Sequence, residues 1–263
     1  MVEKRILDFL NDPIINHRVF YPQALASYGK DSPSRFTLFF EVDDNTKVSA
    51  IFHKSSEDVP TVLFFHGNGE IASDYDFFAS NYTSKLNLCI VEYRGYGLSE
   101  GTPSFSTMLT DAHKIFSDFK KYLTKNGFTG PLILMGRSLG SASAIELASS
   151  YQEDIVALII ESGFAETFKL LYKLGIPKSL LMGHNEMDIS PLPLMEKILR
   201  PTLIIHGERD FIIPVNDAYL LHSACSSENK KLVIITPAGH NDIMNYPLYL
   251  KSIFEFLATQ QIL

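Results

Sequence analysis

Residues 132–148 read LILMGRSLGSASAIELA, and they carry the clearest structural signal in the chain. Four apolar residues come first and small, helix-forming residues come last, so a strand runs directly into a helix. The turn between them is Gly136-Arg137-Ser138-Leu139-Gly140, whose two glycines remove side chains that would collide in a sharp turn. The pattern predicts a strand–turn–helix unit with Ser138 exposed at its tip, where the helix N-terminus directs amides and a partial positive charge.

Short apolar runs recur on both sides of this unit. They are apolar throughout rather than alternating, which is typical of strands covered on both faces in a parallel sheet. Two earlier runs, Arg35–Val42 and Val48–His53, predict an opening antiparallel hairpin with Asp43-Asp44-Asn45 as its turn. The later strands are expected at Thr61–Phe65, Leu88–Tyr93, Leu132–Met135, Ala157–Ile160, Thr202–Ile205 and Lys231–Ile235.

The segments between these runs show helical spacing. Apolar residues recur every three or four positions over 105–123 and again over 246–257, which predicts two core-facing helices. Alternating strands and helices imply right-handed crossovers, so the sequence predicts an α/β fold with a mostly parallel, doubly wound sheet of eight strands. No repeat, low-complexity stretch or linker divides the chain, which favours a single domain over residues 1–263.

One stretch, residues 164–200, is longer than a single crossover helix needs. It contains three methionines and the turn-rich Ser190-Pro191-Leu192-Pro193. Its apolar spacing allows one or two short helices, so we expect it to leave the sheet, return to it and form a small lid. Phe164, Phe168 and Met182 are the candidates to line a shallow substrate cleft beneath that lid.

The composition excludes several classes of protein. With 23 Lys and Arg against 30 Asp and Glu the net charge is −7, and no basic run is present to bind nucleic-acid phosphates. No apolar run approaches the roughly twenty residues of a membrane span, and residues 1–8 carry acidic side chains where a signal peptide would be apolar. Two cysteines, Cys89 and Cys225, do not make a disulfide framework, so we expect a cytoplasmic protein.

Two polar strings follow the last two predicted strands. Asp210 lies in His206–Pro214, and His240 lies in Pro237–Asp242. With Ser138 they give the order serine, acid, histidine that catalytic triads on such strand–turn–helix units use. A serine is a poor nucleophile until an imidazole takes its proton, and a carboxylate fixes the tautomer of that imidazole. We therefore predict Ser138 as nucleophile, His240 as base and Asp210 as acid.

A further part of the predicted site is Phe64-Phe65-His66-Gly67-Asn68-Gly69, which again ends a strand. Backbone N–H groups there can join that of Leu139 in holding the oxyanion of a tetrahedral intermediate. We expect the N–H groups of Asn68 and Leu139 to form this oxyanion hole.

Together these motifs resemble those of the α/β-hydrolase superfamily over nearly the whole chain. The likeness is strongest to small serine hydrolases of the esterase and acyl-thioesterase type, which have minimal lids. It implies an eight-stranded α/β-hydrolase fold and hydrolysis of small-molecule carboxylic esters or thioesters through an acyl-enzyme on Ser138. The matching segments are His66-Gly67-Asn68, Tyr93–Ser99, the Ser138 turn, His206–Pro214 and Gly239-His240.

The sequence departs from this family pattern at a few places. Glu92 before the tyrosine and Ser141 after the turn differ from the commoner residues without disturbing catalysis. The N-terminal lipidation or membrane segment of some eukaryotic relatives is missing, so we expect a soluble enzyme. Two rival functions stay open: a peptidase of the prolyl-oligopeptidase kind, which shares the triad order, and a non-catalytic binding or sensor protein with this fold.

The acid of the triad has one competitor, Glu161, which follows a strand at the position that some superfamily members use. We favour Asp210 because its whole surrounding string fits the commoner position. Arg94 and Arg137 are interpreted as structural residues that pair with carboxylates, for which Glu92 and Glu161 are the candidates.

Other polar residues are assigned structural roles: His66 and His206 end strands, and Asp242 caps the final helix. A metal site would have to combine His206 and Asp242 with Asp210 and His240, which lack paired ligand spacing. No phosphate loop or dinucleotide fingerprint is present either, so we expect neither a metal nor a cofactor.

The acyl-chain preference follows from the size of the expected cleft. Each buried CH₂ contributes about 0.8 kcal/mol, so kcat/KM should rise over the first carbons and level off when the chain outgrows the cleft. The sequence predicts a preference for short to medium chains, of about four to eight carbons. His184, within the lid stretch, is interpreted as a solvated loop histidine.

Overall fold

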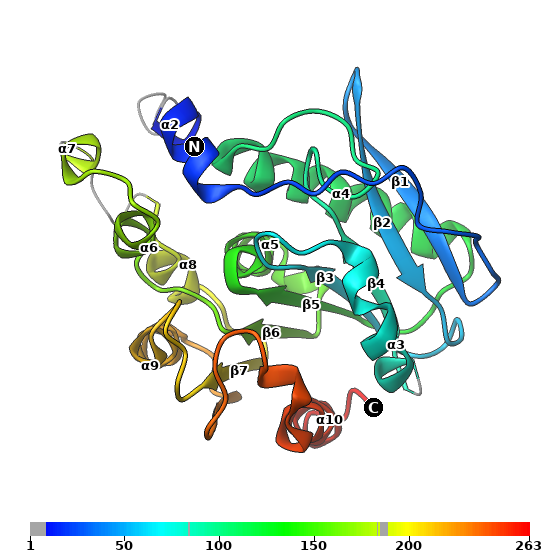
Figure 1. Cartoon of the computed structure of the whole chain (residues 1–263). Coiled ribbons are helices and arrows are strands. Elements are labelled where there is room, and N and C mark those ends of the chain that lie inside the picture. Colours follow the sequence, from blue (N-terminus) through cyan, green and yellow to red (C-terminus); the bar gives the residue numbers. More distant parts are fainter. Residues whose placement is uncertain (1–8, 84, 183, 185–188) are drawn as a thin grey trace.

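Eight strands form one sheet in the order β1-β2-β4-β3-β5-β6-β7-β8. In the computed structural model, which describes residues 9–83, 85–182, 184 and 189–263, helices cover both faces of this sheet (Figure 1). The first two pairings, β1 with β2 and β2 with β4, are antiparallel, and the others are parallel. The strands are β1 (Arg35–Asp43), β2 (Thr46–His53), β3 (Thr61–Phe65), β4 (Asn87–Val91), β5 (Leu132–Arg137), β6 (Ala157–Glu161), β7 (Thr202–Gly207) and β8 (Lys230–Ile235).

Several helices and short 3₁₀ turns connect the strands. Each of α4, α5 and α9 follows one strand and precedes the next parallel one, as the predicted crossovers require. The helices are α2 (Pro13–Val19), α3 (Asp76–Tyr82), α4 (Phe105–Lys125), α5 (Ser141–Ser150), α6 (Thr167–Lys173), α7 (Lys178–Leu181), α8 (Leu192–Met195), α9 (Val215–Ala224) and α10 (Pro247–Thr259). The 3₁₀ turns are η1 (Ala72–Tyr75), η2 (Ser138–Gly140), η3 (Gln152–Asp154) and η5 (Ile243–Asn245).

All eight predicted strands are present: Thr61–Phe65 has the predicted bounds, and the ends of the other seven differ by one or two residues. Asp43 pairs with Thr46 at the end of the hairpin, so the turn is only Asp44-Asn45. The strand predicted to end at Met135 continues to Arg137, because Arg137 pairs with Glu161 of β6. This extension brings β5 to the residue directly before Ser138.

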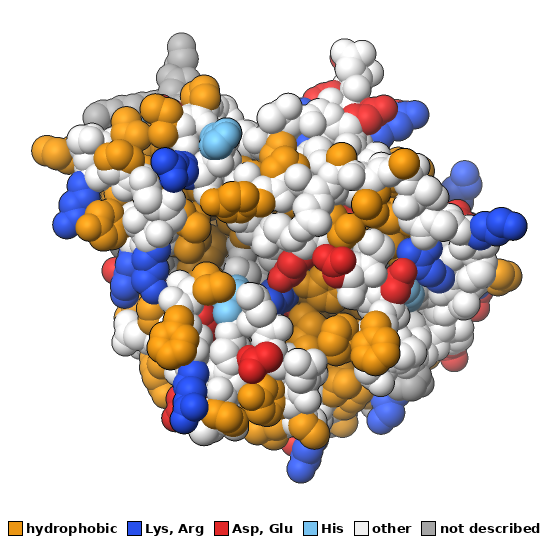
Figure 2. Space-filling model, viewed as in Figure 1, with side chains coloured by type: hydrophobic (Ala, Val, Ile, Leu, Met, Phe, Trp, Pro, Cys, Tyr) orange, Lys and Arg blue, Asp and Glu red, His pale blue; other side chains and the backbone are white. Residues whose placement is uncertain are grey.

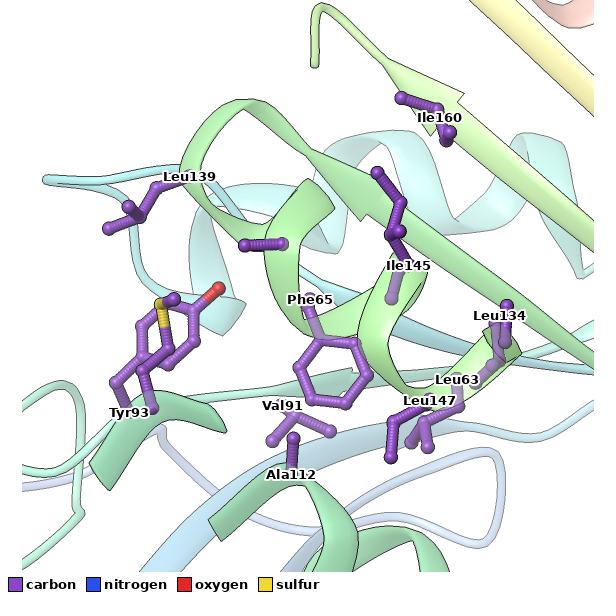
Figure 3. Close-up of a cluster of buried hydrophobic side chains, with 14 of the residues drawn as sticks. Leu63, Phe65, Val91, Tyr93, Ala112, Leu134, Leu139, Ile145, Leu147 and Ile160 are labelled. Carbon is purple, nitrogen blue, oxygen red and sulfur yellow. The ribbon is translucent and has the colours of Figure 1, made fainter. Parts of the chain in front are cut away.

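The core consists of two clusters, one on each face of the sheet. Leu63 and Phe65 of β3 face the cluster under α4 and α5, whereas Val62 and Phe64 face the cluster under α3 and α10. Neighbouring strand residues point to opposite faces, so a strand buried on both must be apolar throughout. Figure 3 shows the α4 and α5 side of the core, with Phe65 of β3 and Ile145 of α5 among its side chains.

The predicted lid stretch, residues 164–200, contains three short helices in its described part rather than one or two. They are α6, α7 and α8, which lie at one side of the molecule in Figure 1. Of these, α8 packs against α5 and α9. Residues 183 and 185–188 of this stretch, which include one of the expected methionines, lie outside the described residues.

Within the described residues, every helix is too short or too polar to cross a lipid bilayer.

Candidate active site

Ser138 lies in a strained turn between β5 and α5. Its φ is +51°, a left-handed conformation that L-residues rarely adopt. The turn lies so close to β3 that a Cβ atom on Gly140 would lie 2.2 Å from the carbonyl oxygen of Phe65. Ser138 was expected to be exposed at the tip, but only 8% of its surface is accessible, because the loops after the neighbouring strands surround it.

The structure brings Ser138, His240 and Asp210 together in one line of hydrogen bonds. The Oγ atom of Ser138 lies 2.9 Å from Nε2 of His240, and Nδ1 of His240 lies 2.6 Å from Oδ2 of Asp210. The three residues follow the carboxyl ends of β5, β8 and β7, which belong to the parallel half of the sheet formed by β5-β6-β7-β8. This arrangement can transfer a proton from the serine to a histidine whose tautomer the carboxylate fixes.

Asp210 is well placed to remain ionised. Its other oxygen, Oδ1, accepts hydrogen bonds from the backbone N–H groups of Ile212 and Ile213, at 2.9 and 2.7 Å. Burial alone would raise the pKa of Asp210, but hydrogen bonds from His206 and His240 outweigh it and hold this pKa well below its ordinary value.

His206 contacts the same carboxylate, which the sequence analysis did not anticipate. Its Nε2 lies 3.3 Å from Oδ2 of Asp210 and 2.9 Å from the carbonyl oxygen of Ile213. Within the described part of the chain, its buried Nδ1 has no hydrogen-bond partner. The available signal was the position of His206 at the end of β7, four residues before Asp210.

The alternative acid, Glu161, faces other partners. Its Oε1 lies 2.5 Å from the guanidinium of Arg137, and its Oε2 accepts a hydrogen bond from the Tyr249 hydroxyl at 2.6 Å. No hydrogen bond between Glu161 and the His240 ring occurs among the described residues. The geometry therefore places Asp210, and not Glu161, against the histidine, and it agrees with the pairing of Arg137 and Glu161.

Arg94 pairs with carboxylates, as expected, but with neither of the two candidates, Glu92 and Glu161. Arg94 extends toward α4 and binds Asp111 at 2.6 Å, and it also contacts Asp43. Glu92 instead binds Nε2 of His66 at 2.8 Å in the protein interior.

Both ring nitrogens of His66 face acceptors, since Nδ1 lies 2.7 Å from the carbonyl oxygen of Gly67 and Nε2 faces Glu92. Burial opposes the charged form of His66, but the hydrogen bond and charge of Glu92 raise its pKa above the ordinary value. The structural role expected for His66 therefore includes holding Gly67, at the start of the predicted oxyanion loop.

The predicted oxyanion donors lie at the ends of β3 and β5. Leu139 is the second residue of η2, where backbone N–H groups lack partners within the helix. The side chain of Asn68 accepts hydrogen bonds from the backbone of Tyr21 and the hydroxyl of Tyr96 and donates one to the carbonyl oxygen of Val19. Among the described residues, no hydrogen bond uses the backbone N–H of Asn68, which remains available to a ligand.

The three residues expected to line the substrate cleft lie apart. Phe164 is buried in the core, Phe168 packs edge-on against the Phe9 ring at 6.0 Å, and Met182 is 77% exposed. His184, expected in a solvated loop, is half-buried with its ring 4.2 Å from that of Phe9.

A cleft of about 250 Å³ lies instead between α4, α5 and the segment before α8. Its apolar lining includes Ala142 of α5, which comes four residues after Ser138 in the chain. Figure 2 shows the surface hollowed in this region, with hydrophobic side chains in the hollow. The other apolar lining residues are Leu10, Phe105, Leu109, Ile189, Pro191, Pro193 and Leu194.

Asp242 does not cap the final helix. Its Oδ1 accepts a hydrogen bond from the backbone N–H of Gly239 at 2.6 Å and so braces the loop that carries His240, while the N-cap residue of α10 is Tyr246. Over the described ranges, no cluster of three or more His, Cys, Asp or Glu side chains could hold a metal ion.

Comparisons with known sequences agree with this geometry. A family profile described as "Serine aminopeptidase, S33" matches residues 56–182. The protein bem46 of Schizosaccharomyces pombe is 30% identical over 215 residues, which cover 80% of this chain and 71% of that protein. The uncharacterized protein YfhR of Escherichia coli K12 is 28% identical over 244 residues, covering 88% of this chain and 82% of that protein.

Solved structures show the same fold. The Pyrococcus furiosus esterase Pf2001 aligns with a TM-score of 0.71 at 19% identity, covering 90% of this chain and 98% of that one. An acylaminoacyl peptidase of Pyrococcus horikoshii aligns with a TM-score of 0.66 at 18% identity, covering 85% of this chain and 41% of that one. At this identity the likeness concerns the fold, which is the mixed, mostly parallel eight-stranded arrangement predicted from the sequence.

Proposed function

The chain belongs to the α/β-hydrolase superfamily, in the family described as serine aminopeptidase S33, and on that premise we propose that it is a serine hydrolase of carboxylic esters or thioesters. The observation that carries the proposal is the hydrogen-bonded line from Asp210 through His240 to the Ser138 hydroxyl, at 2.6 and 2.9 Å. Non-catalytic proteins of this fold usually lack one of the three.

In the proposed reaction, Ser138 attacks the acyl carbon while Nε2 of His240 takes its proton. Asp210 holds the opposite ring nitrogen and stabilises the imidazolium. The backbone N–H groups of Leu139 and Asn68 stabilise the oxyanion of the tetrahedral intermediate. His240 then protonates the leaving group, and water, activated by the same histidine, releases the acyl group from Ser138.

The proposal includes a preference for short to medium acyl chains, with residues 164–200 acting as a small lid. The cleft of about 250 Å³ supports it, because its lining includes Ala142, four residues after the proposed nucleophile. We therefore propose that the residues of this cleft line the acyl-binding site, in place of Phe164, Phe168 and Met182.

A second candidate function is peptidase activity, favoured by the description of the matching family and by the likeness to the acylaminoacyl peptidase. A panel of p-nitrophenyl esters, an acyl thioester and an aminoacyl amide separates the two. Ester or thioester turnover at least tenfold above amide turnover supports the first proposal, whereas the reverse ranking supports the peptidase.

Labelling with a fluorophosphonate tests the mechanism. Wild type should be labelled at Ser138, and Ser138→Ala should keep its thermal unfolding midpoint yet retain only residual catalysis, about 10³ to 10⁴ over water. Near-normal esterase activity in purified Ser138→Ala would reject Ser138 as the nucleophile.

A further inference from the structure

Arg137 is a buried charged residue to which the proposed mechanism gives no role. It ends β5 and is joined by one peptide bond to Ser138. Only 4% of its surface is accessible. Since burying a guanidinium is costly unless its donors are used, its partners indicate what it does.

The guanidinium contacts three separate segments of the chain. Its Nε donates to Oε1 of Glu70 at 2.8 Å, and its NH1 group donates to Oε1 of Glu161 at 2.5 Å. NH1 also donates to the backbone carbonyl of His240 at 3.0 Å, and NH2 donates to Oδ1 of Asn241 at 3.2 Å. Four of the five N–H donors of an arginine can be used in this way.

Two of these segments carry predicted catalytic groups. Glu70 accepts the backbone N–H of Gly67 through Oε2 at 2.7 Å, so it holds the loop that presents Asn68. His240 carries the proposed base, and Asn241 is the next residue. The third segment, at Glu161, provides a fixed point in the sheet.

Arg137 remains charged in this setting. Burial would lower its pKa, but the charges of Glu161 and Glu70 raise that pKa well above its ordinary value. A lysine would keep the charge but would lose the planar set of donors that reaches all three segments together.

We propose that Arg137 is a positioning residue that fixes the loop of His240 and the loop of Asn68 relative to Ser138. This inference rests on the proposed hydrolase function. Because Arg137 is the residue directly before Ser138, its guanidinium positions both loops relative to the backbone of the nucleophile. An error of about 1 Å in such geometry can lower the rate about a hundredfold.

Arg137→Lys tests this inference. We expect kcat to fall about a hundredfold with KM within threefold of wild type. Fluorophosphonate should still label every site in the end, but with a rate constant lowered by a similar factor. If Arg137 only supports folding, the labelled fraction will fall while kcat per labelled site stays at the wild-type value, and that result would overturn the inference.

Arg94→Lys is the matched control. Like Arg137, Arg94 pairs with two carboxylates, here Asp111 and Asp43, but among the described residues it has no hydrogen bond or ion pair with the triad. We expect this variant to be less stable, with kcat per labelled site within twofold of wild type. An equal fall of kcat in both variants would indicate general loosening and would reject a specific role for Arg137.

Asn241→Ala removes a single contact and keeps the inference testable if Arg137→Lys does not fold. It should lower kcat about tenfold, without a change in KM, and its effect should be less than multiplicative when combined with Arg137→Lys. Unchanged kcat in Asn241→Ala, or fully multiplicative effects, would contradict action through the His240 loop. A wild-type protein that hydrolyses nothing and is not labelled would instead reject the hydrolase proposal itself.

Discussion

Asp210 uses its two carboxylate oxygens for different purposes. One accepts two backbone N–H groups of its own loop, and the other faces the rings of His240 and His206. The first set of contacts fixes where the carboxylate lies, and the second fixes which nitrogen of His240 carries the proton. The buried Glu161 shares neither feature.

This contrast predicts how the two acids differ. Asp210→Asn should lower kcat by about four orders of magnitude, because an amide stabilises the wrong histidine tautomer. The factor by which Glu161→Gln lowers kcat should be at least a hundredfold smaller. This variant should also lower the free energy of unfolding, because Arg137 loses a buried negative partner. Steady-state kinetics and urea unfolding of both variants provide the comparison, and the reverse ranking of kcat would make Glu161 the acid.

The buried pair of His66 and Glu92 predicts a dependence of stability on pH. The pKa of His66 is raised by Glu92, so this pair adds stability below the unfolded histidine pKa of about 6.5 and loses that contribution as pH rises through the higher folded value. Glu92→Gln should therefore destabilise the protein more at pH 6 than at pH 9. Urea unfolding at the two pH values measures this, and an equal loss at both would show that the pair is not ionised.

For single residues, the sequence predicts the triad roles of Ser138, Asp210 and His240, because each lies in a short local pattern. It does not predict that Arg94 binds Asp111, nor that His206 touches Asp210. These contacts depend on where the chain turns after it leaves a strand. That direction is set by packing against residues distant in the sequence.

Among the elements, the turn between β5 and α5 is the most constrained. Gly140→Ala would place a methyl group 2.2 Å from the carbonyl oxygen of Phe65, so the backbone must move. We expect the free energy of unfolding to fall by at least about 3 kcal/mol, the upper end of the range for overpacking. We also expect kcat to fall, because the turn carries Ser138.

Gly127→Ala is a suitable comparison for this variant. Gly127 has a φ of +76°, and its Cβ would have no neighbour within 4 Å. Gly127→Ala should lower the free energy of unfolding by about 1–2 kcal/mol, because alanine disfavours the left-handed backbone, and it should leave kcat unchanged. Urea unfolding measures the stability of both variants, and steady-state kinetics measure their kcat. Equal kcat in the two variants would show that the close approach to β3 is not needed for activity.

The elements themselves follow largely from the sequence, since strands buried on both faces and the stripe of α4 are periodic patterns. The stretch 164–200 was less predictable. Its helices α6, α7 and α8 are short, and their positions depend on contacts with α5, α9 and the N-terminal region. The residues expected to line the cleft therefore proved to be dispersed.

For the whole molecule, the parallel sheet gathers the predicted groups at one edge. Asn68, Ser138, Asp210 and His240 all follow the carboxyl ends of strands, where ligands of open α/β sheets bind. The cleft of about 250 Å³ reaches this region through Ala142 of α5, four residues after Ser138. The shared direction of the parallel strands therefore brings these groups to the same edge of the sheet.

The size of that cleft predicts a substrate profile. For p-nitrophenyl esters from acetate to palmitate, kcat/KM should rise about fourfold per CH₂ at first, as 0.8 kcal/mol implies, and level off at about four to eight carbons. Ala142→Leu should shorten the preferred chain and leave acetate unaffected. A series measured below the micelle concentration checks this, and a steady rise through palmitate would require a deep tunnel.

The side chain of Asn68 is held by the carbonyl of Val19 and the amide of Tyr21, in the segment that precedes the first strand. That segment contributes no strand to the eight-stranded sheet. A gene shortened to begin at residue 35 would therefore encode every strand and every member of the triad, yet it would lack two of the three partners of the Asn68 side chain. Boundaries drawn for expression or for protein fusions should therefore include residues 13–34, so that the contacts of Asn68 with Val19 and Tyr21 are kept.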